Sequence, residues 1–195
     1  GVAINVMDTT VSVTNNGTII GNWLKASEIH LVNGSDGEIY AGELMNVDTF
    51  LNHGVLELGE AGSVSMTTIT GDYTQSSTGR IVLTLDPGHE DELLRLDNLV
   101  ISGDAEINGV LQVLLAEDWS SDVGQQVLSL LSVEGELIYD ELELITSAVG
   151  QYALIEGELG DLHLQSDIHF ANDDILAEAN ANQEKIASTL HALYV

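Results

Sequence analysis

Between residues 71 and 115, three short blocks of the chain alternate apolar with polar residues. Alternation with a period of two predicts β-strands that bury one face. Glycines separate the blocks where the chain must turn, and glycine adopts positive φ at little steric cost. We therefore expect the blocks to stack around a common interior. The residues predicted for the stacked core are Ile81, Leu83, Leu85, Leu99, Ile101, Ile107, Leu111, Val113 and Leu115, and those predicted for the turns are Gly79, Gly103 and Gly109.

An asparagine–glycine theme organises the residues before this region. Gly17, Gly37 and Gly54 each precede a short apolar strand and are spaced by 20 and 17 residues. A loose repeat near this length, with strands too short for hairpins of their own, predicts a parallel β-helix of about seven to nine coils. An antiparallel sandwich or barrel is the alternative, since it also has short strands and regular turns. The β-helix is favoured because the Asn-Gly hairpin signal is too irregular to pair every strand with the next.

Two interpretations stay open for the asparagines of these Asn-Gly pairs. Asn16, Asn33 and Asn108 either form a ladder of stacked side chains or serve as turn residues, and no ligand is assigned to them. Trp23 interrupts the first repeat and is expected to fill the core or an edge.

After residue 115 the pattern loosens and then changes. Residues 152–155 and 162–164 predict a closing pair of strands joined through Gly157 and Gly160. A solenoid needs such a cover, because its last coil otherwise exposes unpaired backbone groups and its apolar interior. From Asp173 the period becomes helical, which predicts a short C-terminal α-helix. Its predicted stripe consists of Ala179, Gln183, Ile186, Leu190 and Leu193.

The charge balance restricts the partners. Four basic residues face 32 acidic ones, giving a formal net charge of −28. Nucleic acid and anionic lipid are excluded as partners, because both need Lys or Arg to neutralise phosphates. Such a surface favours solubility and disfavours self-association, so we expect a monomer. A solvated acidic surface is the main interpretation, and a saline habitat or weak Ca²⁺ binding is the alternative.

No motif for catalysis or cofactor binding is present in the sequence. Gly-x-Ser-x-Gly, His-Glu-x-x-His and the phosphate-binding Gly-Lys-Ser/Thr are all missing. Without cysteine, the chain has no disulfide, thiolate metal site or cysteine nucleophile. The six histidines are scattered, and the acidic run at residues 87–92 is expected to be a solvated loop. Neither a signal peptide nor an apolar run of about 18 residues occurs. We therefore expect no enzymatic activity, no cofactor and no obligate metal.

A longer pattern in fixed spacing runs through residues 71–113. It consists of Gly71, Tyr73, Gln75, Gly79, Asp97, Leu99, Ile101, Gly103, Ala105, Ile107, Gly109, Leu111 and Val113. This pattern resembles the C-terminal end of a bacterial autotransporter passenger, the secreted part of a type V secretion protein. Residues 182–190 resemble the linker that precedes the outer-membrane barrel in that family. The chain departs from the family at Val127, where an aromatic residue is usual.

The resemblance implies a fold and a role. The fold is an all-β, right-handed parallel β-helix stem with a C-terminal β cap at residues 1–170. An autochaperone-like region spans about 71–165, and a helical linker at 171–195 leads towards an outer-membrane barrel. Family members often end the stem in an antiparallel pair of strands, which would be the closing pair here.

The implied function is a structural stem that nucleates folding of a passenger secreted to the bacterial cell surface. Its partners would be its own barrel and the outer-membrane assembly machinery, with an export signal upstream. An adhesin surface for host cells, other bacteria or polysaccharide is the alternative. A β-helix enzyme acting on polysaccharide is a third reading, although it needs basic residues that are scarce here.

Overall fold

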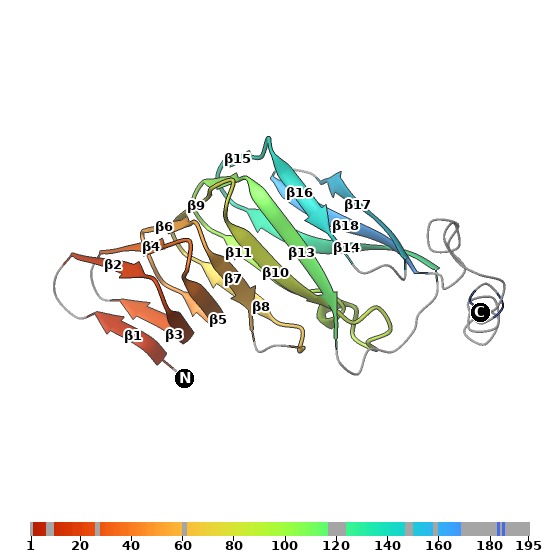
Figure 1. Cartoon of the computed structure of the whole chain (residues 1–195), viewed down its shortest axis with the longest axis horizontal. Helices are drawn as coiled ribbons and strands as arrows, with labels where there is room; N and C mark the ends of the chain where they lie inside the picture. Colours follow the sequence, from red (N-terminus) through yellow and green to blue (C-terminus); the bar gives the residue numbers. More distant parts are fainter. Residues whose placement is uncertain are drawn as a thin grey trace.

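The computed structural model describes residues 2–6, 10–25, 28–59, 62–116, 124–146, 150–157 and 160–168, together with residues 183 and 185. Across these ranges the chain is all-β, and its strands follow one another along the long axis (Figure 1). The predicted C-terminal helix lies outside the described residues, apart from Gln183 and Lys185, which are both in helical conformation.

Twelve strands form a large sheet, which is mostly parallel. Ten of them are paired side by side in the order β16-β13-β10-β7-β5-β8-β11-β14-β18-β17. The other two lie off this path: β3 pairs with β5 and with β1. The strands of this sheet are β1 (Val2–Val6), β3 (Thr18–Lys25), β5 (Glu38–Met45), β7 (Val55–Leu58), β8 (Met66–Ile69), β10 (Arg80–Leu85), β11 (Asn98–Ile101), β13 (Gly109–Leu115), β14 (Gly124–Val133), β16 (Leu142–Ile145), β17 (Gly150–Glu156) and β18 (Asp161–Ile168).

Six strands form a smaller sheet, in the order β15-β12-β9-β6-β4-β2. They are β2 (Val11–Asn15), β4 (Ile29–Asn33), β6 (Thr49–Asn52), β9 (Asp72–Gln75), β12 (Ala105–Ile107) and β15 (Leu137–Ile138). All five pairs in this sheet are parallel. The described part of the chain therefore has six levels in this sheet, fewer than the seven to nine coils expected.

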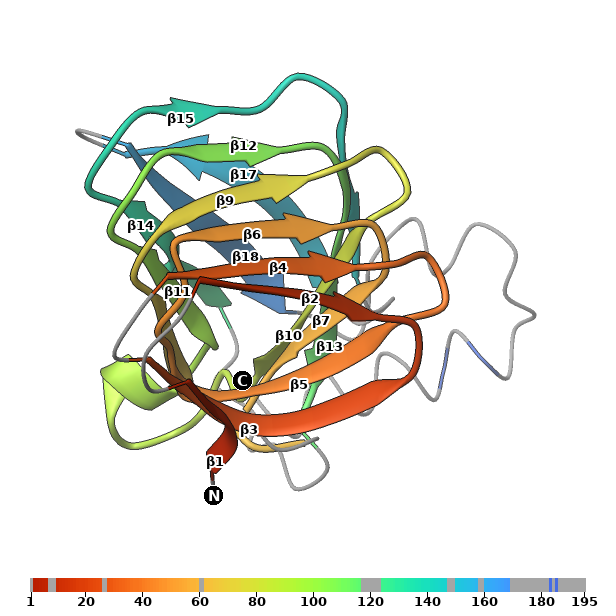
Figure 2. The same ribbon diagram turned by 90° about the vertical axis from the view of Figure 1, so that its left-hand side faces the viewer.

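The large sheet turns a corner at β5. Residues 38–41 of this strand pair with β7, whereas Leu44 and Met45 pair with β8. One face is therefore β7-β10-β13-β16 and a second is β8-β11-β14, while the small sheet makes a third (Figure 2). The parallel pairing in all three faces does not fit the antiparallel alternative for this part of the chain.

The repeat lengthens along the chain. Equivalent ladder positions are 18 residues apart between Asn15 and Asn33, and 19 apart between Asn33 and Asn52. The separation between Asp72 and Asp104 has grown to 32 residues. The added length lies mainly in the excursion between β10 and β11, which contains the only 3₁₀ helix of the described residues, η1 (Glu92–Leu94).

One continuous apolar core fills the space between the three faces. Strand residues alternate between this core and the outside, which is why the burial of β18 and β6 alternates strictly. Aromatic residues are few, and Phe50 and Tyr73 pack edge to face with their ring centroids 5.2 Å apart. Trp23 is fully buried, so the expectation that this side chain fills the core is confirmed.

The last two strands pair differently from the rest. β17 and β18 are antiparallel over residues 150–156 and 162–168, so the predicted antiparallel closing pair is confirmed. β18 also pairs antiparallel with β14, which carries a bulge between Ser129 and Leu131. Tyr139, which follows β15, donates a hydrogen bond of 2.5 Å to Glu156 Oε1 on β17. The closing pair is thereby tied to the last level of the parallel stack.

Candidate functional site

The two predicted rows of aliphatic residues lie on neighbouring strands. In the parallel register of β10 and β13, the Cα partners are Ile81 with Leu111, Leu83 with Val113, and Leu85 with Leu115. Five of these six side chains are at most 2% exposed, and the sixth, Leu115, is half-buried. The row continues on both sides, because Ile81 also pairs with Leu56 and Leu111 with Leu144. These residues stack at one level after another along the interior.

The other three predicted core residues occupy the remaining faces. Leu99 and Ile101 of β11 are buried and lie between β8 and β14. Ile107 of β12 is also buried and is the register partner of Gln75 on β9. The structure thus distributes the nine predicted core residues over all three faces of one interior.

The predicted turn glycines are needed for different reasons. Gly109 has φ of +75°, as predicted from the sequence. Gly79 and Gly103 do not have positive φ, so that reason is wrong for them. At Gly79 an added Cβ would lie 2.6 Å from the Asn52 carbonyl oxygen, and at Gly103 it would lie 2.7 Å from the Gly71 carbonyl carbon. Close approach to the previous level excludes a side chain at these two turns.

Replacing Gly109 by alanine should be clearly destabilising. The new Cβ would meet the Gly79 carbonyl oxygen at 2.5 Å and the Ser76 carbonyl oxygen at 2.7 Å, in a backbone conformation that alanine disfavours. We expect Gly109→Ala to lower the free energy of unfolding by about 2–4 kcal/mol, measured by urea denaturation. Gly17→Ala is the matched control, because nothing lies within 4 Å of its Cβ position. Equal stability of the two variants would contradict this account of the turns.

Beside the aliphatic rows runs a ladder of buried amide side chains, at the ends of β2, β4, β6 and β9. Asn15 Nδ2 donates to Asn33 Oδ1 at 2.8 Å, and Asn33 Nδ2 donates to Asn52 Oδ1 at 2.9 Å. Asn52 Nδ2 continues to Gln75 Oε1 at 3.2 Å, and Gln75 Nε2 ends the chain on the Asn108 carbonyl at 2.6 Å. We call these four side chains the amide ladder.

Of the three asparagines singled out from the sequence, only Asn33 has its side chain in the amide ladder. Asn108 contributes its backbone carbonyl, and Asn16 is exposed beside the ladder. The other ladder members are harder to recognise in the sequence. The feature shared by Asn15, Asn52 and Gln75 is that each precedes a turn glycine by two or four residues.

Each rung of the amide ladder also caps backbone groups at a turn. Asn33 Nδ2 lies 3.1 Å from the Gly37 carbonyl and 3.0 Å from the Val55 carbonyl. Tyr73 lies next to the ladder, and its hydroxyl donates to Gln75 Oε1 at 3.0 Å. Burial raises the pKa of the Tyr73 hydroxyl, the hydrogen bond with Asn52 acting in the opposite direction. The ladder therefore satisfies polar groups that the turns bring into the interior.

Asp97 is a buried carboxyl that connects three segments. It is 0% exposed and accepts hydrogen bonds from the backbone N–H of Ser65 at 2.5 Å and of Thr84 at 2.6 Å. Its own N–H donates to the Thr84 carbonyl at 2.9 Å. Asp97 thereby fastens the end of the β10–β11 excursion to β10 and to the approach to β8. Burial raises the pKa of Asp97 to about 7, and the bonds from Thr84 and Ser65 oppose this shift.

The raised pKa of Asp97 predicts a pH dependence of stability. The carboxyl has an ordinary pKa of 3.8 in the unfolded chain and of about 7 in the folded one. Between these values the unfolded chain has released the proton and the folded chain keeps it, so this contribution to stability is complete below about pH 4 and is lost as the pH rises to about 7. Because asparagine does not titrate, we expect the urea midpoint of Asp97→Asn to change less between pH 4 and 7 than the midpoint of the unmodified chain. Asp36→Asn, at an exposed turn, controls for the change in net charge. Parallel curves for Asp97→Asn and the unmodified chain would refute the assignment.

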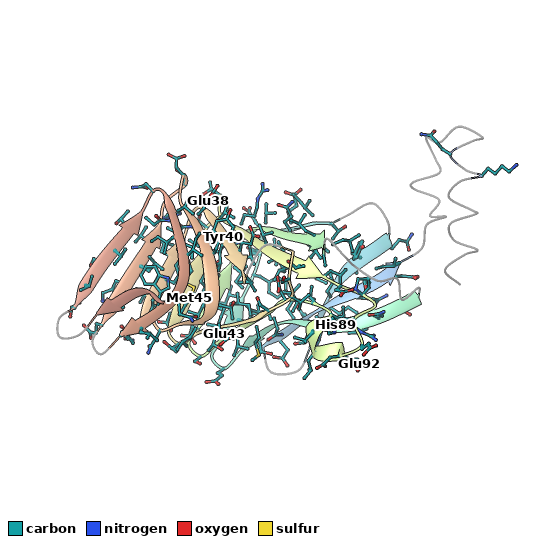
Figure 3. The ribbon with its side chains drawn as sticks, turned by 90° about the horizontal axis from the view of Figure 1, so that it is seen from below. Glu38, Tyr40, Glu43, Met45, His89 and Glu92 are labelled. Carbon is teal, nitrogen blue, oxygen red and sulfur yellow. The ribbon has the colours of Figure 1, made fainter. Side chains whose placement is uncertain are left out.

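Acidic side chains also meet on the outer face of the large sheet. Glu57 on β7 is the register partner of Tyr40 on β5, and Glu38 lies beside Tyr40 (Figure 3). The pKa of Tyr40 is raised, mainly by the negative charges of Glu38 and Glu57. Partial burial, followed by the charge of Glu38, raises the pKa of Glu57. This arrangement concentrates negative charge and offers no paired base and nucleophile.

The described ranges contain no group of three or more His, Asp or Glu side chains arranged to hold a metal ion. Within the same ranges, no helix has the length and apolar character needed to cross a membrane. A comparison with known protein families finds no family model that matches the chain. A comparison with curated proteins finds no match either.

Proposed function

We propose that this chain is the C-terminal part of a secreted autotransporter passenger, built as a right-handed parallel β-helix stem with a β cap. One observation carries the proposal. Positions that match the family pattern coincide with the buried and stacked positions of the interior. Tyr73, Gln75, Asp97, Leu99, Ile101, Ala105, Ile107, Leu111 and Val113 are each at most 2% exposed. A surface loop has no reason to bury this set together.

The buried polar members of the set support the proposal further. A strand pattern alone explains the apolar positions, but it does not explain a buried glutamine and a buried aspartate. In this chain Gln75 ends the amide ladder, and Asp97 holds the β10–β11 excursion. Both side chains connect one level of the stack to another, which is what a stem must do to remain in register.

The role of the C-terminal region follows from how a parallel stack grows. Each level offers a row of open backbone groups on which the next level forms. The antiparallel pair β17–β18 covers one end of the stack and is attached to it through β14 and through Tyr139. We propose that residues of about 71–165 fold first and then template the levels before them, as an autochaperone region does.

Surface display tests this proposal directly. The chain is fused between an export signal and the outer-membrane barrel of an autotransporter that has lost its own passenger. We expect a protease-resistant fragment on the outside of intact Gram-negative cells. A fusion in which residues 71–165 are replaced by their own sequence in scrambled order is the control, and it should be displayed in a protease-sensitive form. Equal resistance of both fusions, or equal sensitivity, would overturn the proposed role.

A further inference from the structure

The excursion between β10 and β11 forms a fixed wall over the outer face of the large sheet. An antiparallel bridge joins Leu85 to Leu96 at its base. Within it, Arg95 Nε donates to the His89 carbonyl at 2.9 Å, and Asp91 accepts the N–H of Leu93 at the start of η1. Gln126 Nε2 on β14 donates to the Pro87 carbonyl at 3.0 Å. Figure 3 shows His89 and Glu92 together on this excursion.

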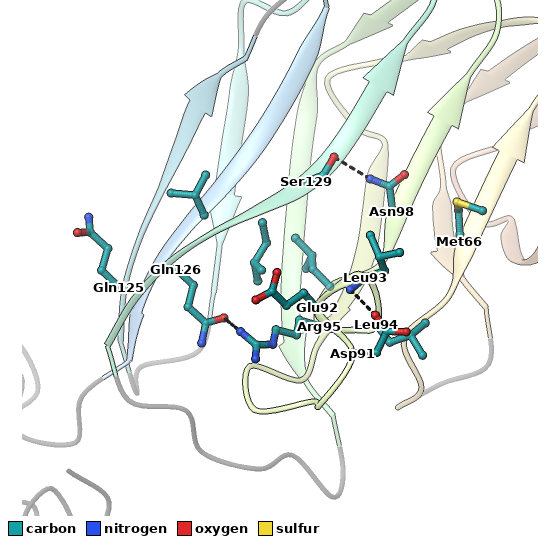
Figure 4. Close-up of a pocket in the computed structure, with 13 residues that line it drawn as sticks. Met66, Asp91, Glu92, Leu93, Leu94, Arg95, Asn98, Gln125, Gln126 and Ser129 are labelled. Atoms are coloured by element: carbon teal, nitrogen blue, oxygen red, sulfur yellow. Dashed lines mark hydrogen bonds between the residues drawn. The ribbon is translucent and has the colours of Figure 1, made fainter.

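A groove of about 880 Å³ lies between η1 and the outer faces of β8, β11 and β14 (Figure 4). Four exposed apolar side chains line it: Leu93 at 85%, Met66 at 61%, Val127 at 57% and Leu94 at 41% exposed. They are half of the eight large apolar residues that are exposed in the described ranges. Such a concentration in one groove, on a chain with so many acidic residues, indicates an interaction surface.

The occupant that fits this groove is a polypeptide segment. Side chains that enclose a small ligand are largely buried in the pocket wall, whereas Leu93 and Met66 project into solvent. Apolar side chains that stand on both sides of an open groove suit the apolar face of a docking segment.

The charge around the groove specifies that segment. Asp91 and Glu92 line the groove, and Asp167 is the register partner of Gln125 at its far side. Among the described residues that line the groove the cation is Arg95, whose Nε donates to the His89 carbonyl and whose Nη1 lies 3.5 Å from Gln126 Oε1. Acidic side chains at the edge of a groove with apolar walls are complementary to a cationic amphipathic segment.

The same charge argues against the two occupants that the chain itself could supply. A second copy carries a net charge of −28 and is repelled. Residues 171–195 contain four acidic side chains and one lysine, so this segment is also net negative.

We propose that the groove docks a segment of a partner protein that presents leucine-like side chains flanked by Lys or Arg. This surface is distinct from the stem proposal, because none of the nine predicted core residues lines the groove, although Leu96 and Leu128 of the core cluster form part of its wall.

Fluorescence anisotropy with a labelled amphipathic peptide of leucine and lysine tests the proposal on the full chain, at about 150 mM salt. We expect Leu93→Ser and Val127→Ser each to weaken binding by about tenfold or more. Ile20→Ser is the matched control, because Ile20 is 69% exposed on β3, outside the groove, and its replacement should leave the affinity unchanged. Circular dichroism spectra and melting temperatures establish that the variants fold. Two groove variants are used so that the test remains possible if one of them does not fold.

Five results would overturn the proposal. Equal affinity for all variants would mean that charge alone attracts the peptide, and no binding would mean that the groove is not a docking site. Equal binding of a peptide with glutamate in place of lysine would refute the charge argument. A dimer seen by sedimentation that Leu93→Ser abolishes would assign the groove to a second copy. Peptide binding that appears only after Leu190→Ser and Leu193→Ser would assign it to the chain's own C-terminal segment.

Discussion

Leu111→Asp should leave the chain without a cooperative folding transition. Leu111 is 1% exposed and stacks between Ile81 on β10 and Leu144 on β16. The substitution removes a buried leucine, which costs about 2–5 kcal/mol, and places a carboxylate where no partner reaches it, which costs several more. A cost of more than about 5 kcal/mol is comparable with the whole stability of a domain of this kind.

The control for this variant lies three residues further along the same strand. Leu114 points outward from β13 and is 45% exposed, so Leu114→Asp introduces the same charge without burying it. We expect Leu114→Asp to retain a β-type circular dichroism spectrum and a cooperative urea transition. Leu111→Asp should show neither. A cooperative transition with an unchanged midpoint in Leu111→Asp would mean that the aliphatic rows do not hold the stack together.

Period-two alternation located the interior of this chain well. The strands β10, β11 and β13 lie where the alternation indicated, because in a strand the side of each residue is fixed by its parity. Parallel pairing follows from the repeat, since equivalent strands about 20 residues apart have enough chain between them for the crossover that parallel pairing needs. The alternation is local and the repeat is visible along the chain, so both can be recognised in the sequence.

The polar interior could not be predicted in the same way. Asn15, Asn33 and Asn52 form a ladder only because the turns of successive levels align in space. Little in the sequence distinguishes the buried Asn15 from the exposed Asn16 beside it: Asn15 continues the inward alternation of Val11 and Val13, and Asn16 follows the end of β2. Asp97 likewise looks like one more acidic residue among 32, and its burial depends on an excursion that folds back to Thr84.

The glycines show a similar division between local and tertiary causes. Positive φ at Gly109 is a local property that turn chemistry indicates. At Gly79 and Gly103 the reason is a carbonyl group of the previous level, which belongs to a distant part of the sequence. The groove beside η1 is also tertiary, because Met66, Leu93 and Val127 come together from three separate segments.

Asn33→Ala should have the second largest effect, through the amide ladder. Asn33 is fully buried; its Oδ1 accepts from Asn15 and its Nδ2 donates to Asn52. Alanine leaves Asn52 Oδ1 without its ladder donor and removes the donor to the Gly37 and Val55 carbonyls, whereas Asn15 Nδ2 keeps the Gly17 and Glu38 carbonyls. Each unsatisfied buried group costs about 1–3 kcal/mol, so we expect a loss of roughly 3 kcal/mol in the free energy of unfolding.

Thermal and urea denaturation measure this loss, which corresponds to about 6–12 °C in melting temperature for a chain of this length. Asn16→Ala is the control, since Asn16 is exposed one residue from Asn15 and its replacement should change stability by less than about 0.5 kcal/mol. Double replacement of Asn33 and Asn52 should cost less than the sum of the two single replacements, because the second removes a group that the first had already left unpaired. Strict additivity of the two changes would show that the amides act as separate turn caps, and the stack would then owe its register to the aliphatic rows alone.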